Sequence, residues 1–206
     1  GDEDADRHTG RSYFAWFLHL MREYDAAHML LHVSEAWHNQ EDPDRTRDVK
    51  AGWTFEMAEA LRAADPRTPS LQMVSNRTFS SDLREAALSL PFVSERPDGT
   101  LRCFDADYSG TYEEAQARGR HYAALTAHFL RETGHPSFLT WLALDVEPGQ
   151  SVSGLRIGFL AALTEIAASS PIESTVHAKA MHPFYEAGEA PVSPGDGPGE
   201  PVSRVS

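Results

Sequence analysis

Aromatic and aliphatic residues near the start of the chain recur at steps of three and four, the spacing of one face of an α-helix. Five of them share an arc about 120° wide on a helical projection: Tyr13, Phe14, Phe17, Met21 and Tyr24. Ser12 can cap the start of this helix, and Asp42-Pro43 is a stop signal. The pattern therefore predicts one long amphipathic helix over residues 11–40.

The second half of this predicted helix has two competing faces. One face continues the apolar arc with Asp25, His28, Leu31, His32 and Glu35, and the other consists of Met29, Leu30, Val33 and Trp37. If the first face is buried, its imidazoles and carboxylates must be paired or bind a metal, because unpaired buried charges are costly. If the second face is buried, those groups remain in water. The sequence leaves this choice open.

Shorter helices and one β-hairpin are expected in the rest of the chain. Helices are predicted over residues 48–64, 82–90, 111–133, 136–144, 151–169 and 171–186. Ser80 or Ser81 is the expected cap of the second of these, and a loop with Pro69 and Asn76 precedes it. Thr111 and Gly134 bound the third. The segment Arg96-Pro97-Asp98-Gly99 has good hairpin-turn chemistry, with apolar residues on either side.

Both ends of the chain are polar. Residues 1–10 are predicted to be disordered, and residues 187–206, rich in Pro, Gly and Ser, to form a tail or linker. The helical domain would then occupy residues 11–186. The fold class predicted is mainly α: a six- or seven-helix, bundle-like single domain with one small β-hairpin.

A second stripe of imidazoles and carboxylates lies on the predicted helix 111–133. It consists of Glu114, His121, Leu125, His128 and Glu132, next to an apolar face of Tyr122, Thr126, Phe129 and Leu130. Because this stripe borders the apolar face, its side chains could point inward as ligands or form a half-exposed polar edge.

Composition restricts the classes of function. The chain has 206 residues, 41% of them hydrophobic, and a formal net charge of -13. Such a charge repels nucleic acid and anionic membranes. The sequence has no apolar run of the ~18 residues that a membrane helix needs, so we expect no membrane-spanning segment. Cys103 is the only cysteine, so neither an intrachain disulfide nor a thiolate cluster can form. We expect a soluble, cytoplasmic protein in which Cys103 is structural.

Imidazole and carboxylate ligands without thiolate suit iron, manganese or zinc. The candidate metal ligands are Asp25, His28, His32, Glu35, Glu85, His121, His128 and Glu132. Glu35-x-x-His38 also matches the Glu/His element that helical di-iron sites use. These residues predict a metal-dependent enzyme that acts on a small molecule, most specifically a non-haem iron oxidase or oxygenase, with no catalytic residue assigned.

The spacing of these residues resembles that of the haem-oxygenase-like dimetal oxidases. Asp25-x6-His32 resembles the first ligand element of that superfamily, and Glu85 (or else Glu56 or Glu59) would be the second. His128-x3-Glu132-x2-His135 resembles the third, with His121 as an alternative member. The resemblance spans about residues 11–145. It departs from the usual pattern at Asp25, where Glu is usual, and at His135, which lies between Gly134 and Pro136. The resemblance implies a di-iron site at which reduced metal activates dioxygen.

Other functions stay open. A haem protein could use His28, His32 or His128 as axial ligand, and a mononuclear metal hydrolase or a cofactor-free acid/base enzyme could use the same residues. The non-enzymatic alternative is an acidic protein-protein interaction or regulatory domain. A helix as apolar all round as residues 13–21 could also pack against a second copy to form a homodimer.

Overall fold

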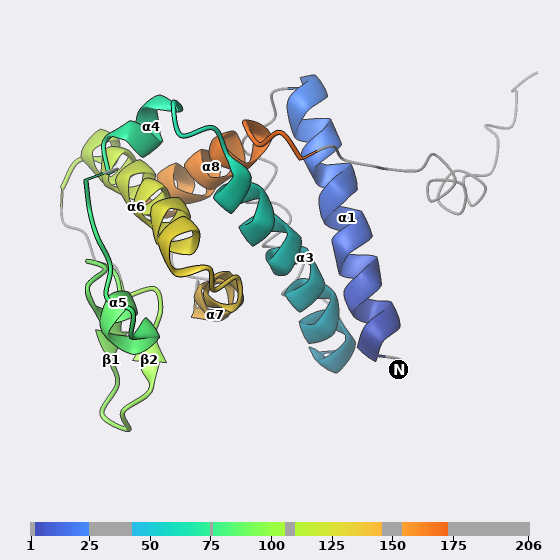
Figure 1. The fold of residues 1–206 in the computed structure, drawn as a ribbon, viewed down its shortest axis with the longest axis horizontal. Helices are drawn as coiled ribbons and strands as arrows, with labels where there is room; N and C mark the ends of the chain where they lie inside the picture. The colour runs from blue at the N-terminus through green and yellow to red at the C-terminus, as the bar shows by residue number, and fades with distance from the viewer. Residues whose placement is uncertain (1–2, 25–42, 75, 106–109, 146–153, 173–206) are drawn as a thin grey trace, which may run out of the picture. The chain divides into compact units, whose positions relative to one another are not determined.

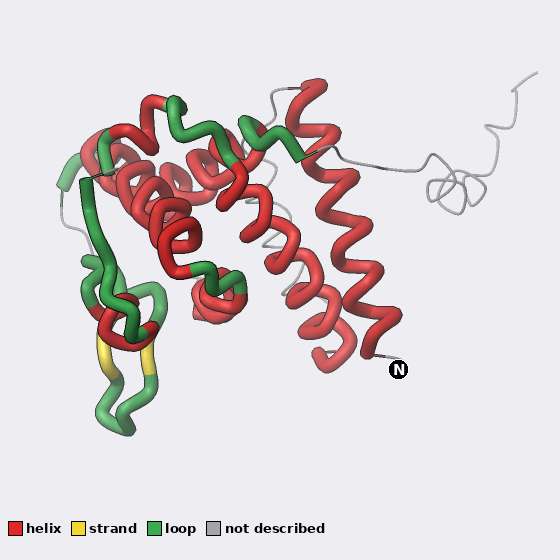
Figure 2. Tube along the Cα trace, viewed as in Figure 1, coloured by secondary structure: helices red, strands yellow, loops and turns green. Residues whose placement is uncertain are grey.

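The computed structural model describes residues 3–24, 43–74, 76–105, 110–145 and 154–172. These residues form a mainly α structure with one small two-stranded antiparallel sheet (Figure 2), which confirms the predicted fold class. The chain divides into a unit of residues 1–176 and a unit of residues 177–206, and the second lies outside the described residues. The predicted helix 171–186 and the predicted tail 187–206 therefore lie essentially outside the described part as well.

Helix α1 (Glu3–Tyr24) begins within the segment that the sequence predicts to be disordered. Its first turn carries Glu3, Asp4 and Asp6, whose negative charges complement the positive end of the helix dipole. Arg7 forms an ion pair with Glu3 at 2.5 Å, one turn apart. Ser12 is consequently not a cap: it lies inside the helix, and its hydroxyl donates to the carbonyl of His8. The predicted continuation from Asp25 to Gln40 lies outside the described residues.

Helix α3 (Pro43–Ala63) packs beside α1 and runs in the same direction (Figure 1). The two backbones meet at Gly10 and Gly52. A Cβ atom on Gly10 would lie 2.8 Å from the backbone nitrogen of Trp53, and one on Gly52 would overlap the carbonyl of Arg7. On the same face of α1, Phe14 packs edge-on against Trp53, with 5.1 Å between ring centroids. Glycine therefore permits a contact that no other residue would allow.

The buried face of α1 is narrower than the predicted arc. Phe14, Phe17 and Met21 are buried as expected, together with Leu18. Tyr13 and Tyr24, at the edge of the arc, are exposed. The helical period thus predicted the centre of this face correctly but overestimated its width.

Helices α6 (Tyr112–Thr133) and α8 (Gly154–Ala168) form a second close pair. Thr111 caps α6 through a capping box with Glu114, and Gly134 ends it in the left-handed conformation (φ 70°), which confirms both predicted boundaries. A Cβ atom on Gly154 would lie 2.6 Å from the carbonyl oxygen of Tyr112, and one on Gly158 would overlap the carbonyl of Gln116. These glycines therefore allow the backbones of α6 and α8 to pack closely.

The chain between the two pairs forms short elements. Helix α4 (Pro69–Gln72) occupies part of the predicted loop, because Pro69 suits the first turn of a helix. Helix α5 (Leu83–Leu88) is capped by Asp82 rather than by Ser80 or Ser81. Strands β1 (Ser94–Glu95) and β2 (Leu101–Arg102) form the predicted hairpin, with Glu95 opposite Leu101. Gly99 has a φ of 83° in its turn.

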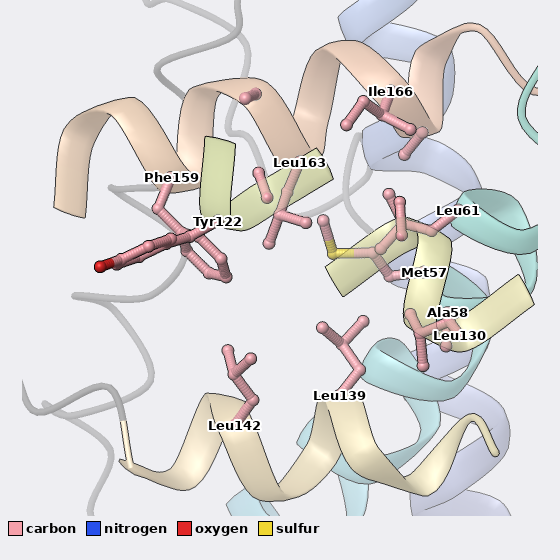
Figure 3. Close-up of a cluster of buried hydrophobic side chains, with 14 of the residues drawn as sticks. Met57, Ala58, Leu61, Tyr122, Leu130, Leu139, Leu142, Phe159, Leu163 and Ile166 are labelled. Atoms are coloured by element: carbon pink, nitrogen blue, oxygen red, sulfur yellow. The ribbon is translucent and has the colours of Figure 1, made fainter. Parts of the chain in front are cut away.

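Helix α7 (Ser137–Asp145) completes the core. Figure 3 shows Leu139 and Leu142 of α7 pointing toward buried side chains of α3, α6 and α8. The labelled members of this cluster are Met57, Ala58, Leu61, Tyr122, Leu130, Leu139, Leu142, Phe159, Leu163 and Ile166. No helix in the described ranges is long and apolar enough to cross a membrane.

Two arginines join helices by capping the C-terminal end of a neighbour. Arg22 of α1 donates to the carbonyl oxygen of Ala168 (3.1 Å), the last residue of α8, and to that of Ile172 (2.9 Å), four residues beyond the helix. Arg131 of α6 donates to the carbonyl oxygen of Ala64 (2.8 Å) at the end of α3. Each guanidinium satisfies terminal carbonyls and lies at the negative end of a helix dipole. These contacts link α1 to α8 and α6 to α3.

Candidate functional site

The predicted metal ligands divide into two groups of four. Asp25, His28, His32 and Glu35 lie outside the described residues. The other four, Glu85, His121, His128 and Glu132, are described, but they are not brought together. Within the described ranges, no group of three or more His, Cys, Asp or Glu side chains could hold a metal ion.

His128 is the one buried member of the described four, with 6% of its surface exposed. Its Nε2 lies 2.6 Å from the carbonyl oxygen of Arg77, and its ring lies 5.7 Å from that of Phe79. The carbonyl can only accept, so Nε2 carries a proton and donates this hydrogen bond. This hydrogen bond fixes both the ring orientation and the tautomer.

The other three described candidates face solvent. His121 and Glu132 are exposed on α6. Burial of part of its ring lowers the pKa of His121, and the positive charges of Arg118 and Arg77 lower it further. Glu85 accepts a hydrogen bond from the Ser80 hydroxyl at 2.7 Å. These three residues do not converge with His128 on a common point within the described part.

A pocket lies elsewhere, where the hairpin, the start of α5 and helix α7 meet. Its volume is about 640 Å³, within the range of small-molecule sites. We call it the hairpin pocket, and its lining residues are Asp82, Leu83, Arg84, Arg96, Leu101, Cys103, Trp141 and Asp145. The pocket thus combines two guanidinium groups, two carboxylates and one large aromatic ring.

Asp145 ties the hairpin to α7 along one wall of this pocket. Its Oδ1 accepts from Nη2 of Arg96 at 2.6 Å, and its Oδ2 accepts from the backbone N–H of Cys103 at 2.5 Å. Arg96 also donates through Nη1 to the carbonyl of Leu101 at 2.7 Å. Both oxygens of the carboxylate and both ends of the guanidinium are therefore engaged, so this wall is fixed.

The wall that α5 contributes is more open. Arg84 pairs with Glu95 of β1 at 2.9 Å, and both side chains are about half exposed. Asp82 accepts through Oδ1 from the backbone N–H of Glu85 at 2.8 Å, and it is exposed. Trp141 of α7 leaves 43% of its surface open. These exposed groups can contact a ligand without the loss of a buried interaction.

Cys103 is buried at the edge of the hairpin pocket. Burial, together with the nearby Asp145 carboxylate, raises the pKa of its thiol to about 11, while Arg96 acts in the opposite direction. The thiolate is the nucleophilic form of cysteine. Cys103 is therefore a neutral, structural side chain at physiological pH, as the sequence predicted.

We expect Cys103 in the folded chain to react with iodoacetamide at pH 8 about a hundredfold more slowly than in the urea-unfolded chain, because the thiolate fraction falls with the raised pKa. The same pKa shift makes the free energy of unfolding depend on pH, because the folded state holds the thiol proton more tightly than the unfolded state. The stabilisation is fully present below the unfolded pKa near 9.0 and is lost as the pH rises toward 11. Cys103 is the only cysteine, so mass spectrometry of the intact chain measures it directly. Equal rates in both states would contradict the assignment.

Sequence reasoning missed the hairpin pocket. Its charged residues come from α5, the hairpin and α7, and no motif connects these segments along the chain. Trp141 belongs to no motif either, and it lies exposed on α7. The one available signal was the hairpin itself, because its predicted turn fixes where Arg96 and Leu101 lie.

Comparison with known proteins adds no further constraint. No protein-family model matches the chain, and no curated protein or solved structure matches it.

Proposed function

We propose that this chain is a small-molecule-binding domain whose ligand occupies the hairpin pocket. The observation that carries the proposal is the pocket itself: about 640 Å³, lined by Trp141, two leucines and charges of both signs. Sites for small molecules typically combine apolar or aromatic walls with a few placed polar groups. The hairpin pocket has this composition.

Binding without catalysis is favoured by the state of the lining groups. Both oxygens of Asp145 are hydrogen-bonded, and the Cys103 thiol is protonated at neutral pH. No histidine belongs to the described lining. In the described lining, Asp82 alone keeps a carboxylate oxygen without a hydrogen bond, and this exposed carboxylate has no activated nucleophile beside it. This favours the regulatory or interaction function among the predicted alternatives, with a small molecule as the ligand.

The proposal can be tested with three phenyl compounds that differ in charge: phenylalanine, phenethylamine and 3-phenylpropionate. In a spectrum of the ¹⁵N-labelled chain, at least one compound should shift the indole N–H signal of Trp141 saturably, with a Kd of about 1 mM or lower. The signal is assigned with Trp141→Phe. Trp53, which is buried between α1 and α3, is the internal control and should not shift. If none of the compounds shifts Trp141 at concentrations tenfold above that Kd, the proposal is wrong.

A second candidate function, the metal-dependent oxidase, is favoured by one observation on His128. Metal-bound imidazoles usually donate their other nitrogen to a carbonyl or carboxylate, and Nε2 of His128 is held in this way by Arg77. A metal would bind Nδ1. The other ligands would have to come from Asp25, His28, His32 and Glu35, and bound iron would supply oxygen activation.

This candidate predicts a transition metal in protein purified without chelator, and loss of that metal in His128→Ala. His121→Ala is the matched control, since His121 lies on the same helix but is exposed. Metal content well below one equivalent, with no uptake of ferrous iron added without oxygen, would exclude the oxidase. The result does not affect the hairpin pocket.

A further inference from the structure

We infer that the hairpin pocket binds a zwitterion of the α-amino-acid class that carries a flat apolar substituent. The inference rests on the proposed function and names its ligand. The first observation is charge balance. Arg84 and Arg96 face the same pocket as Asp82 and Asp145, so the lining carries two positive and two negative groups.

Balanced charges select against ions of a single sign. A simple anion is attracted to a guanidinium group but repelled by a carboxylate in the same pocket. A simple cation is attracted to the carboxylate but repelled by the guanidinium group. The chain as a whole, with its net charge of -13, also repels anions at a distance. A molecule with one carboxylate and one ammonium group can satisfy charges of both signs at once.

The open wall of the pocket provides one group of each sign. Among the described residues, Arg84 is engaged only by a half-exposed ion pair with Glu95, and exposed pairs of this kind contribute little free energy. Arg84 can therefore exchange Glu95 for a ligand carboxylate. Asp82 uses Oδ1 to cap α5, and a second carboxylate oxygen is available for an ammonium group. The fixed Arg96–Asp145 wall supplies shape rather than new bonds.

The apolar part of the pocket defines the rest of the ligand. Trp141 presents a large, open ring surface, and Leu83 and Leu101 are half-buried in the lining. The neutral Cys103 thiol adds a further surface of low polarity. A flat substituent can stack on the indole ring while the leucines cover its edges. Phenylalanine is therefore the simplest probe of this class.

The inference can be tested by comparing the binding of phenylalanine with that of two derivatives that each lack one of its charges. N-acetylphenylalanine lacks the ammonium group, and phenylalaninamide lacks the carboxylate. We expect each derivative to bind about tenfold more weakly than phenylalanine, as judged by the Trp141 indole signal. Two variants identify the partners. Arg84→Gln should weaken the binding of phenylalanine about tenfold and leave the binding of phenylalaninamide unchanged. Asp82→Asn, which keeps the helix cap, should weaken the binding of phenylalanine and leave the binding of N-acetylphenylalanine unchanged.

Arg120→Gln is the matched control. Its guanidinium pairs with Glu165 at 2.8 Å on the surface of α6 and α8, outside the hairpin pocket, and its loss should not alter binding. If either derivative binds as tightly as phenylalanine, or if Arg84→Gln and Asp82→Asn bind phenylalanine normally, the zwitterion inference is overturned while the pocket proposal stands. If no compound of any charge shifts Trp141, the pocket proposal itself fails.

Discussion

Replacing Gly119 with alanine is expected to lower the free energy of unfolding by about 2–3 kcal/mol, the usual cost of overpacking. For a chain of this size the loss corresponds to a fall in Tm of about 4–12 °C. A Cβ atom on Gly119 would lie 2.6 Å from the backbone nitrogen of Phe159 and would overlap the carbonyl of Leu155. Backbone atoms of a packed helix cannot rotate away as a side chain can. Helices α6 and α8 would have to separate along their whole contact.

The sign of this effect separates packing from helix propensity. In the interior of an unpacked helix, glycine to alanine stabilises by up to about 1 kcal/mol. Ala117→Gly is the matched control: it is the reverse change at an exposed position two residues away in α6, and it should cost about 1 kcal/mol by propensity alone. Denaturant unfolding of both variants measures the two effects. If the Gly119→Ala protein were as stable as the original chain, the backbones of α6 and α8 could not be in close contact at Gly119.

Replacing Asp145 with alanine is expected to lower the free energy of unfolding by about 2 kcal/mol and to weaken ligand binding at the hairpin pocket. The variant leaves the Cys103 N–H and a guanidinium nitrogen of Arg96 without their acceptor. Asp145 is mostly buried, with 18% of its side chain exposed, so water replaces these bonds poorly. The hairpin then loses its attachment to α7. We expect faster hydrogen exchange at the Cys103 amide and at least a tenfold weaker binding of phenylalanine.

Asp105→Ala is the control for Asp145→Ala. Asp105 is also a carboxylate of the hairpin region, paired with Arg102 at 3.2 Å and accepting from the Ser94 hydroxyl at 2.6 Å, but 41% of its side chain is exposed. Exposed ion pairs contribute about 0–1 kcal/mol, so this variant should fold and bind nearly normally. Equal losses in both variants would show that Asp145 has no special role in holding the hairpin.

Much of the local structure could be predicted because its determinants lie close together along the chain. Thr111 and Gly134 bound α6 through hydrogen bonds within one turn of the helix end. The hairpin register follows from the turn that contains Gly99. The start of α1 was missed for a related reason. Polar composition suggested disorder, although the acidic first turn and the Glu3–Arg7 pair favour a helix.

The burial of the predicted metal ligands on α6 could not be deduced from their spacing. Helical spacing placed His121, His128 and Glu132 on one stripe, but only His128 is buried. When a stripe of side chains borders the core, the neighbouring segments of the chain decide which of these side chains are buried and which stay exposed. Phe79 and the Arg77 carbonyl cover His128, and neither residue can be identified as its neighbour from spacing along α6.

The sequence by itself determined the fold class, most helix boundaries in the described part, the hairpin and the structural nature of Cys103, because these depend on local periodicity, capping and composition. Only the tertiary structure decided the two glycine-mediated helix contacts and the hairpin pocket. Asp145 meets Arg96 across 49 residues of sequence, and Gly119 meets Phe159 across a similar separation. Such contacts arise from how whole helices pack, and no short-range pattern records which distant residues will then share a surface.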